Sequence, residues 1–276
     1  MSLSTLVQMR ARTDVSVPAS YLLLPLGSYL LWAIFVVAWW GAGAGLGTGD
    51  LTLVVSGLGI VGLVASTAAS YVIYLVMSRA NRHSSRTRAL LWTTVGELQS
   101  SPGTGGQAAL LPLSSAEDGL YRLSRGEHER SAMLWSLLAL IPVIGWIFLV
   151  VALWLISRDF TRHARLEELV LEDIDRSMKG TGLQGTSIGH GSVASRDILG
   201  VSVVIVSLIE LLSAFLLGPA GCLVLVDLTV GAFSLVWLDL SIRDPTVHFS
   251  FHSQFESDIL RSLPDAVGGA SNVGAG

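Results

Sequence analysis

The chain has 276 residues, of which 51% are hydrophobic and 14% are charged, and its mean hydropathy is +0.62. Soluble domains carry about 25% charged residues, so this composition indicates a membrane protein. The net charge of −4 does not favour nucleic acid as a partner, and the single cysteine, Cys222, excludes an intramolecular disulfide and any metal site built from cysteines.

The N-terminal unit, residues 1–99, is expected to hold two membrane spans. Residues 1–17 are polar and are predicted to be frayed. Tyr21–Trp40 and Leu51–Met77 carry no charge, and each is long enough to cross a hydrocarbon core of about 30 Å. The first of them is longer than the apolar region of a signal peptide, so it is interpreted as a retained span.

A basic tail follows the second span at 78–88. It runs into residues 89–98, whose apolar side chains recur at helical spacing. This pattern predicts an amphipathic helix that lies at the membrane surface or on its neighbours.

The middle unit covers 117–179 and follows a Gly/Ser/Pro-rich linker at 100–116. A charged helix is expected from 117 to 130. The apolar segment 131–156 contains Pro142 and Gly145, so both a single crossing and a membrane-embedded hairpin are open. The tail 158–179 is amphipathic, with one apolar side and one acidic side. The apolar side holds Phe160, Leu166, Leu169, Val170, Ile174 and Met178, and the acidic side holds Glu167, Glu168, Glu172, Asp173 and Asp175.

The C-terminal unit, 197–263, is expected to be a two-span hairpin that ends in a tail helix. A flexible linker at 180–196 precedes it, and a disordered tail at 264–276 follows. The tail helix carries an apolar series at Phe249, Phe251, Phe255, Ile259 and Leu263.

Positive charge predicts the topology. All 17 Lys and Arg residues lie in the N-terminus, 78–130, 158–196 and 241–276. If 131–156 enters and leaves on one side, all of them share one face, which the positive-inside rule makes cytoplasmic. The predicted fold is therefore an all-α integral membrane bundle of four transmembrane helices plus an embedded hairpin or fifth span. Its amphipathic helices and both termini are cytoplasmic.

The three tails share a repeated motif. Arg158, Asp159 and His163 recur as Arg243, Asp244 and His248, and 158–178 matches 243–263 at eight of twenty-one positions. A degenerate copy has Arg79 and His83. Arg at a membrane edge anchors to phosphates, and Asp stabilises a helix start, where proline at 245 is tolerated. His is expected to pair with that Asp or with a neighbouring tail.

A metal site would need histidines from several copies to converge, because no cysteines contribute. No metal or other cofactor is predicted on this basis. The remaining histidines, His128, His190 and His252, are interpreted as solvent or linker residues.

Two carboxylates, Glu210 and Asp227, lie well inside the last apolar runs. An ionised carboxylate there costs about 2.5–3.5 kcal/mol on insertion scales, so at least one is expected to be protonated. The pair forms either an interhelical hydrogen bond or a proton or cation site.

No catalytic motif is present: the chain lacks H-E-x-x-H, G-x-S-x-G and a P-loop. The predicted role is therefore a non-enzymatic membrane scaffold or interaction protein. The alternative is a small transporter or proton pathway that uses Glu210 and Asp227. The expected partners are the lipid bilayer, anionic lipid at the cytoplasmic face, and either a second copy of the chain or another membrane protein.

The segments 228–237 and 242–249, with the similar copy at 154–168, carry a family resemblance. They resemble uncharacterised prokaryotic, chiefly archaeal, small membrane proteins. In that family a span with Thr-x-Gly ends in an aromatic residue and then a basic-Asp-Pro-Asn-x-His-Phe tail. Thr246 stands where the pattern has Asn. The resemblance implies a multi-pass membrane fold and carries no activity.

Overall fold

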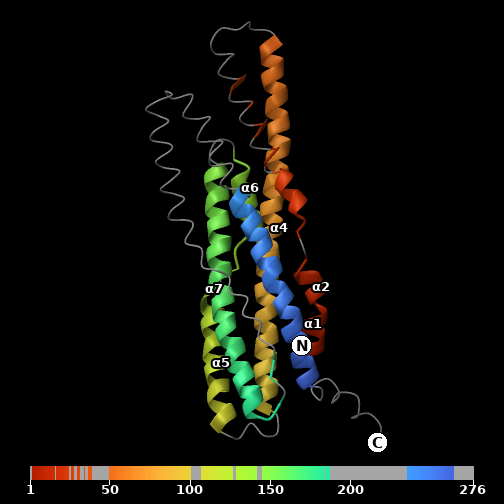
Figure 1. The fold of residues 1–276 in the computed structure, drawn as a ribbon. Helices are drawn as coiled ribbons and strands as arrows, with labels where there is room; N and C mark the ends of the chain where they lie inside the picture. Colours follow the sequence, from red (N-terminus) through yellow and green to blue (C-terminus); the bar gives the residue numbers. More distant parts are fainter. Residues whose placement is uncertain are drawn as a thin grey trace, which may run out of the picture.

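The computed structural model describes most of 2–38, then 50–100, 107–126, 129–141, 145–183, 185–186 and 235–263. Every regular element in these ranges is helical, which confirms the all-α class. Figure 1 shows an elongated bundle in which α4 runs the full length and the other helices pack along it.

The N-terminus is ordered and packed, so the prediction of a frayed segment is wrong. Helix α1 (Leu3–Gln8) begins at Ser2, whose hydroxyl accepts a hydrogen bond from the backbone N–H of Thr5. Helix α2 (Arg10–Thr13) follows directly, and the 3-10 helix η1 (Ala19–Leu22) leads toward the first predicted span. Leu3 and Leu6 enter the hydrophobic core, which is why this short polar stretch is held in place.

Helix α4 (Asp50–Ser100) joins the second predicted span and its basic tail into one helix. No proline interrupts these 51 residues, so the backbone hydrogen bonds continue from the apolar part into the basic part. The tail packs on its neighbours, with Leu90, Leu91, Val95 and Leu98 buried.

The middle unit forms three helices. Helix α5 (Gln107–Gly126) begins within the predicted linker 100–116, well before the expected start at 117. Helix α6 (Ala132–Ala139) is followed by α7 (Gly145–Gly180). Between them the sequence has Pro142, which cannot donate a backbone hydrogen bond and so favours a break.

Helices α6 and α7 form a hairpin beside α4. The Arg130 carbonyl accepts from Asn81 and the Ser136 hydroxyl donates to the Ser70 carbonyl, so α6 runs antiparallel to α4. Leu153 of α7 belongs to the same buried cluster as Ile73 of α4, and His163 further along α7 contacts His83 further along α4, so α7 runs parallel to α4. The described parts of 131–156 are thus two helices of opposite direction, and the membrane-embedded hairpin stays a prediction.

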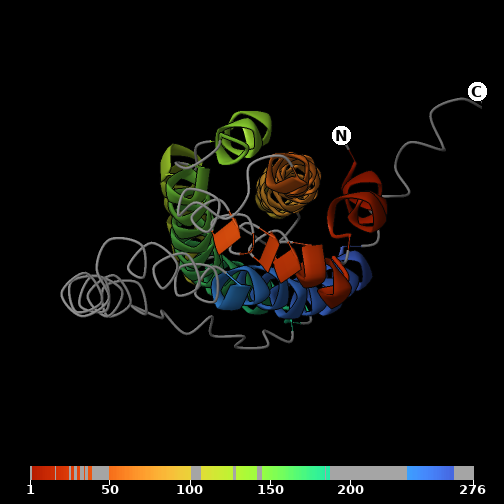
Figure 2. The same ribbon diagram turned by 90° about the horizontal axis from the view of Figure 1, so that it is seen from above.

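The last described helix covers 235–262. This helix is continuous through Pro245. The motif copy Arg243, Asp244 and His248 therefore lies inside a helix, and the prediction that a helix starts there is wrong. Viewed along the bundle in Figure 2, this helix (blue) lies between α7 and the N-terminal helices, with α4 beside it.

Among the described residues, two clusters of buried side chains make up the core. The lower cluster joins α1, α4, α5, α7 and the 235–262 helix, and it includes Leu6, Leu120, Ile174 and Ile259. The upper cluster joins α4, α6, α7 and the same last helix. The predicted units 1–99, 117–179 and 197–263 therefore share one core across their described parts.

The upper part of the bundle exposes large apolar side chains. Leu53 is 75% exposed on α4, Met133 is 65% exposed on α6, and Val236 is 60% exposed on the last helix. Within the described residues, one helix is long and apolar enough to cross a membrane, at Gly59–Ser100. The lower cluster differs from this upper part, because it contains most of the largest fully buried apolar side chains.

We expect Ile174→Ala to destabilise the bundle by about 2–5 kcal/mol, because this fully buried side chain leaves a cavity among α4, α5 and α7. Leu169→Ala on the same helix is the control, since Leu169 is 54% exposed and its loss should cost less than about 0.5 kcal/mol. Thermal unfolding in detergent, followed by circular dichroism, measures both. Equal losses would contradict the packing of this helix.

Candidate metal centre

The histidines of the three motif copies converge at one point in the bundle. His83 comes from α4, His163 from α7 and His248 from the 235–262 helix, and all three are buried. Their ring centroids lie 5.6 Å apart for His83 and His163, 5.5 Å for His83 and His248, and 6.0 Å for His163 and His248. Each tail therefore presents the same motif position to a common axis.

The residue four positions after each motif histidine also faces this axis. These residues are Thr87, Glu167 and His252, and all three are buried. Residues four apart lie on the same face of a helix, so each tail contributes a pair of polar side chains. The cluster is thus built from three helical pairs: His83 with Thr87, His163 with Glu167, and His248 with His252.

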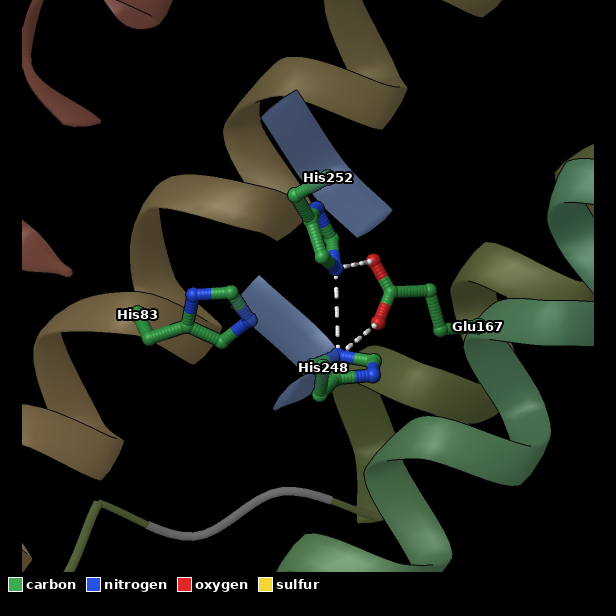
Figure 3. Close-up of side chains that lie close together, drawn as sticks. All are labelled: His83, Glu167, His248 and His252. Carbon is green, nitrogen blue, oxygen red and sulfur yellow. Dashed lines mark hydrogen bonds and ion pairs between the residues drawn. The ribbon is translucent and has the colours of Figure 1, made fainter. Parts of the chain in front are cut away.

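Glu167 lies at the centre of the histidines. Its Oε2 is 2.9 Å from His248 Nε2 and 3.3 Å from His163 Nε2, and its Oε1 is 2.9 Å from His252 Nε2. The Nε2 atoms of His248 and His252 are 3.1 Å apart. Figure 3 shows Glu167, His248, His252 and His83 pointing toward one another from three helices.

The spacing of these atoms fits a coordinated metal ion. One ligand atom each from His83, Glu167, His248 and His252 lies within 4.8 Å of all the others. A tetrahedral zinc ion with Zn–N bonds of 2.0–2.1 Å has ligand atoms about 3.3 Å apart. Three contacts in the cluster, at 2.9, 2.9 and 3.1 Å, already approach that separation. The convergence that a metal site requires is therefore present.

Electrostatics favour an ionised Glu167 and a neutral His248. Burial alone would raise the pKa of Glu167, but the charges of His252, His248 and His163 more than offset it and hold that pKa well below the usual value. Burial lowers the pKa of His248, and its contact with Glu167 only partly restores it. An ionised carboxylate and a neutral imidazole are the forms that coordinate a metal.

A second buried layer of charges supports the cluster. Asp14 Oδ1 is 3.0 Å from His83 Nδ1, and Asp14 Oδ2 is 2.8 Å from Arg86 NH2. Arg86 NH1 in turn lies 2.7 Å from Glu256 Oε1. Burial raises the pKa of Glu256, and Arg86 and His252 counter part of that rise. The N-terminus, α4 and the last helix are joined here by ion pairs.

The other motif residues lie around the cluster and make separate contacts. Arg79 donates to the Thr246 hydroxyl and lies 4.5 Å over the Phe249 ring. Asp159 pairs with Arg130 at 2.6 Å, and Arg158 lies over Trp154. On the last helix, Arg243 pairs with Asp239 within an exposed turn, and Asp244 is half-buried. None of these Arg or Asp residues belongs to the group of converging ligand atoms.

Two residues of the cluster were misassigned from the sequence. Glu167 was placed on an acidic, solvent-facing side, and His252 was interpreted as a solvent or linker residue; both are buried, so both predictions are wrong. The i+4 spacing from His163 and His248 is the signal that could have identified them. Glu210 and Asp227 lie outside the described residues, as do His128 and His190.

Comparison with protein-family models, with curated proteins and with solved structures found no match. The resemblance to archaeal membrane proteins stays a prediction.

Without metal, the bundle should lose stability as the pH falls below about 6.5, the pKa of an unfolded histidine. His248 has a lowered pKa in the folded chain, so acid adds a proton more readily to the unfolded state. Its contribution is complete above pH 6.5 and declines below it. The stability from Glu167, whose pKa is lowered, is present above about pH 4.5 and is lost only as the pH falls below that, and Glu256, with its raised pKa, acts in the opposite direction.

The measurement is the melting temperature in a chelator between pH 7.5 and pH 5.5, for the unchanged chain and for His248→Gln. The unchanged chain should show the steeper decline. Parallel curves would mean that His248 is not held neutral by burial.

Proposed function

We propose that this chain is a multi-pass membrane protein whose cytoplasmic bundle binds a divalent transition-metal ion. The ligands are His83, Glu167, His248 and His252. The metal ties the tails of the three membrane units to one another. The role is that of a metal-stabilised scaffold without enzymatic activity.

The observation that carries this proposal is the convergence of four ligand atoms from three helices in a buried site. Imidazole nitrogen with one carboxylate suits zinc, iron, nickel and copper, whereas calcium and magnesium prefer oxygen ligands alone. A metal-free network, in which imidazole N–H groups donate to the ionised Glu167, is the competing explanation of the same contacts.

A structural role fits the number of ligands. Catalytic zinc keeps one position for water or substrate and has three protein ligands, while structural zinc has four. The four side chains here come from elements far apart in the sequence, so a bound ion would hold α4, α7 and the last helix in register. Such an ion would contribute directly to the stability of the folded bundle.

The membrane part of the proposal rests on where apolar and charged side chains lie. Leu53 at the upper end of α4, Val236 at the upper end of the last helix and Met133 on α6 are exposed apolar side chains that lipid would cover. The lower part contains the larger buried cluster and the basic tails, so we assign it, with both termini, to the cytoplasm. Anionic lipid at that face and a second membrane protein or copy of the chain are the proposed partners.

Topology can be tested with introduced cysteines on the Cys222→Ala background. A cysteine at Thr48 should react with an impermeant thiol reagent from outside the cell, and one at Ser192 only from the cytoplasm, because the α6–α7 hairpin returns the chain to the same side. Labelling of both positions from outside would exclude this arrangement.

Metal binding can be tested with purified, chelator-treated protein in detergent. The unchanged chain should bind one equivalent of Zn²⁺, and Co²⁺ should give the intense visible absorption of a tetrahedral site. Glu167→Gln and His252→Gln should each weaken Zn²⁺ binding by more than about 100-fold, since losing a direct ligand exceeds the 10–100-fold typical of an outer-shell partner.

The matched control is Glu172→Gln, which neutralises a carboxylate on the same helix that pairs with Arg176 near the surface. It should bind Zn²⁺ as the unchanged chain does. Absence of stoichiometric binding in the unchanged chain would leave the metal-free hydrogen-bonded network as the explanation of the cluster.

A further inference from the structure

The N-terminal segment reaches the proposed metal centre through one side chain. Asp14 follows α2, and its side chain is only 5% exposed although the segment lies at the edge of the bundle. Its Oδ1 lies 3.0 Å from His83 Nδ1, on the side of the ring away from the cluster. Asp14 is therefore positioned as an outer partner of a metal ligand.

This contact determines which nitrogen of His83 is available to a metal. A carboxylate accepts hydrogen bonds and cannot donate them, so the contact places the ring proton on Nδ1. The lone pair is then on Nε2, the atom that faces the other ligands. In metal sites a carboxylate in this place fixes the ring and makes it a stronger ligand.

The segment is held by contacts that do not involve the metal ligands. Leu3 and Leu6 are buried in the lower core, and Arg10 lies 3.5 Å from Glu256. Arg86 forms ion pairs with both Asp14, at 2.8 Å, and Glu256, at 2.7 Å. Docking of the segment and binding of the metal thus use different contacts. The hydrogen bond between Asp14 and His83 connects the two.

We propose that residues 2–14 form a clasp that sets the affinity of the metal centre, with Asp14 as the positioning residue for His83. The inference rests on the proposed metal binding. Because coupling between two binding events is reciprocal, the docked clasp strengthens metal binding and the bound metal keeps the clasp docked. A change that releases the N-terminus would therefore lower the affinity for metal.

The first test compares Zn²⁺ affinity in the full chain, Asp14→Asn and Asp118→Asn. Asp14→Asn keeps the shape of the side chain but removes its charge, and should weaken binding about 10–100-fold. Asp118 is an exposed carboxylate on α5, and its amide variant should bind Zn²⁺ unchanged. Circular dichroism confirms that each variant is folded.

The second test loosens the clasp at a distance. Leu6→Ala removes a core contact of α1 without touching the site, and it should also weaken Zn²⁺ binding. Hydrogen exchange gives the reciprocal measurement: Zn²⁺ should slow exchange of residues 3–14 in the unchanged chain and do so much less in Asp14→Asn.

The outcomes separate the two proposals. If the unchanged chain binds no Zn²⁺, both are overturned. If it binds Zn²⁺ but Asp14→Asn binds equally well, or if Zn²⁺ leaves exchange at 3–14 unaltered, the metal centre stands and the clasp is wrong.

Discussion

The buried charge of Glu167 is the constraint around which the lower bundle is arranged. A carboxylate removed from water on all sides is costly unless opposite charge or hydrogen-bond donors surround it. Here the Nε2 atoms of His163, His248 and His252 lie within 3.3 Å of the Glu167 carboxylate oxygens. These contacts require α7 and the last helix to keep a fixed register, and His83 brings α4 to the same level. Loss of that register would leave the charge unpaired in the core.

The internal repeat explains why three helices contribute side chains to one site. Each tail leaves the apolar part of the molecule and turns its motif histidine inward, and the residue four positions later follows on the same face. The positions have diverged to Thr87, Glu167 and His252, so three copies of one pattern supply different chemistry. A single carboxylate among several imidazoles results, and this composition suits a transition metal.

The Arg and Asp residues of the motif serve a different purpose. Arg79 binds the Thr246 hydroxyl across the interface, and Asp159 holds Arg130 at the base of the hairpin. They join neighbouring elements at the edge of the cluster. The motif thus combines an inward histidine for the shared site with outer charges that join adjacent tails.

The sequence by itself determined the all-α class, the amphipathic character of the tails and much of their apolar faces. Hydrophobic periodicity depends only on local helix geometry, and it placed Ile174, Phe255 and Ile259 on apolar faces; these three side chains are buried. The same reasoning placed Glu167 outward, because a local pattern assigns charge to solvent and contains no information about a partner helix. Only the tertiary structure, by packing three tails side by side, brought the histidines together and provided Glu167 with the neighbours that make its burial tolerable.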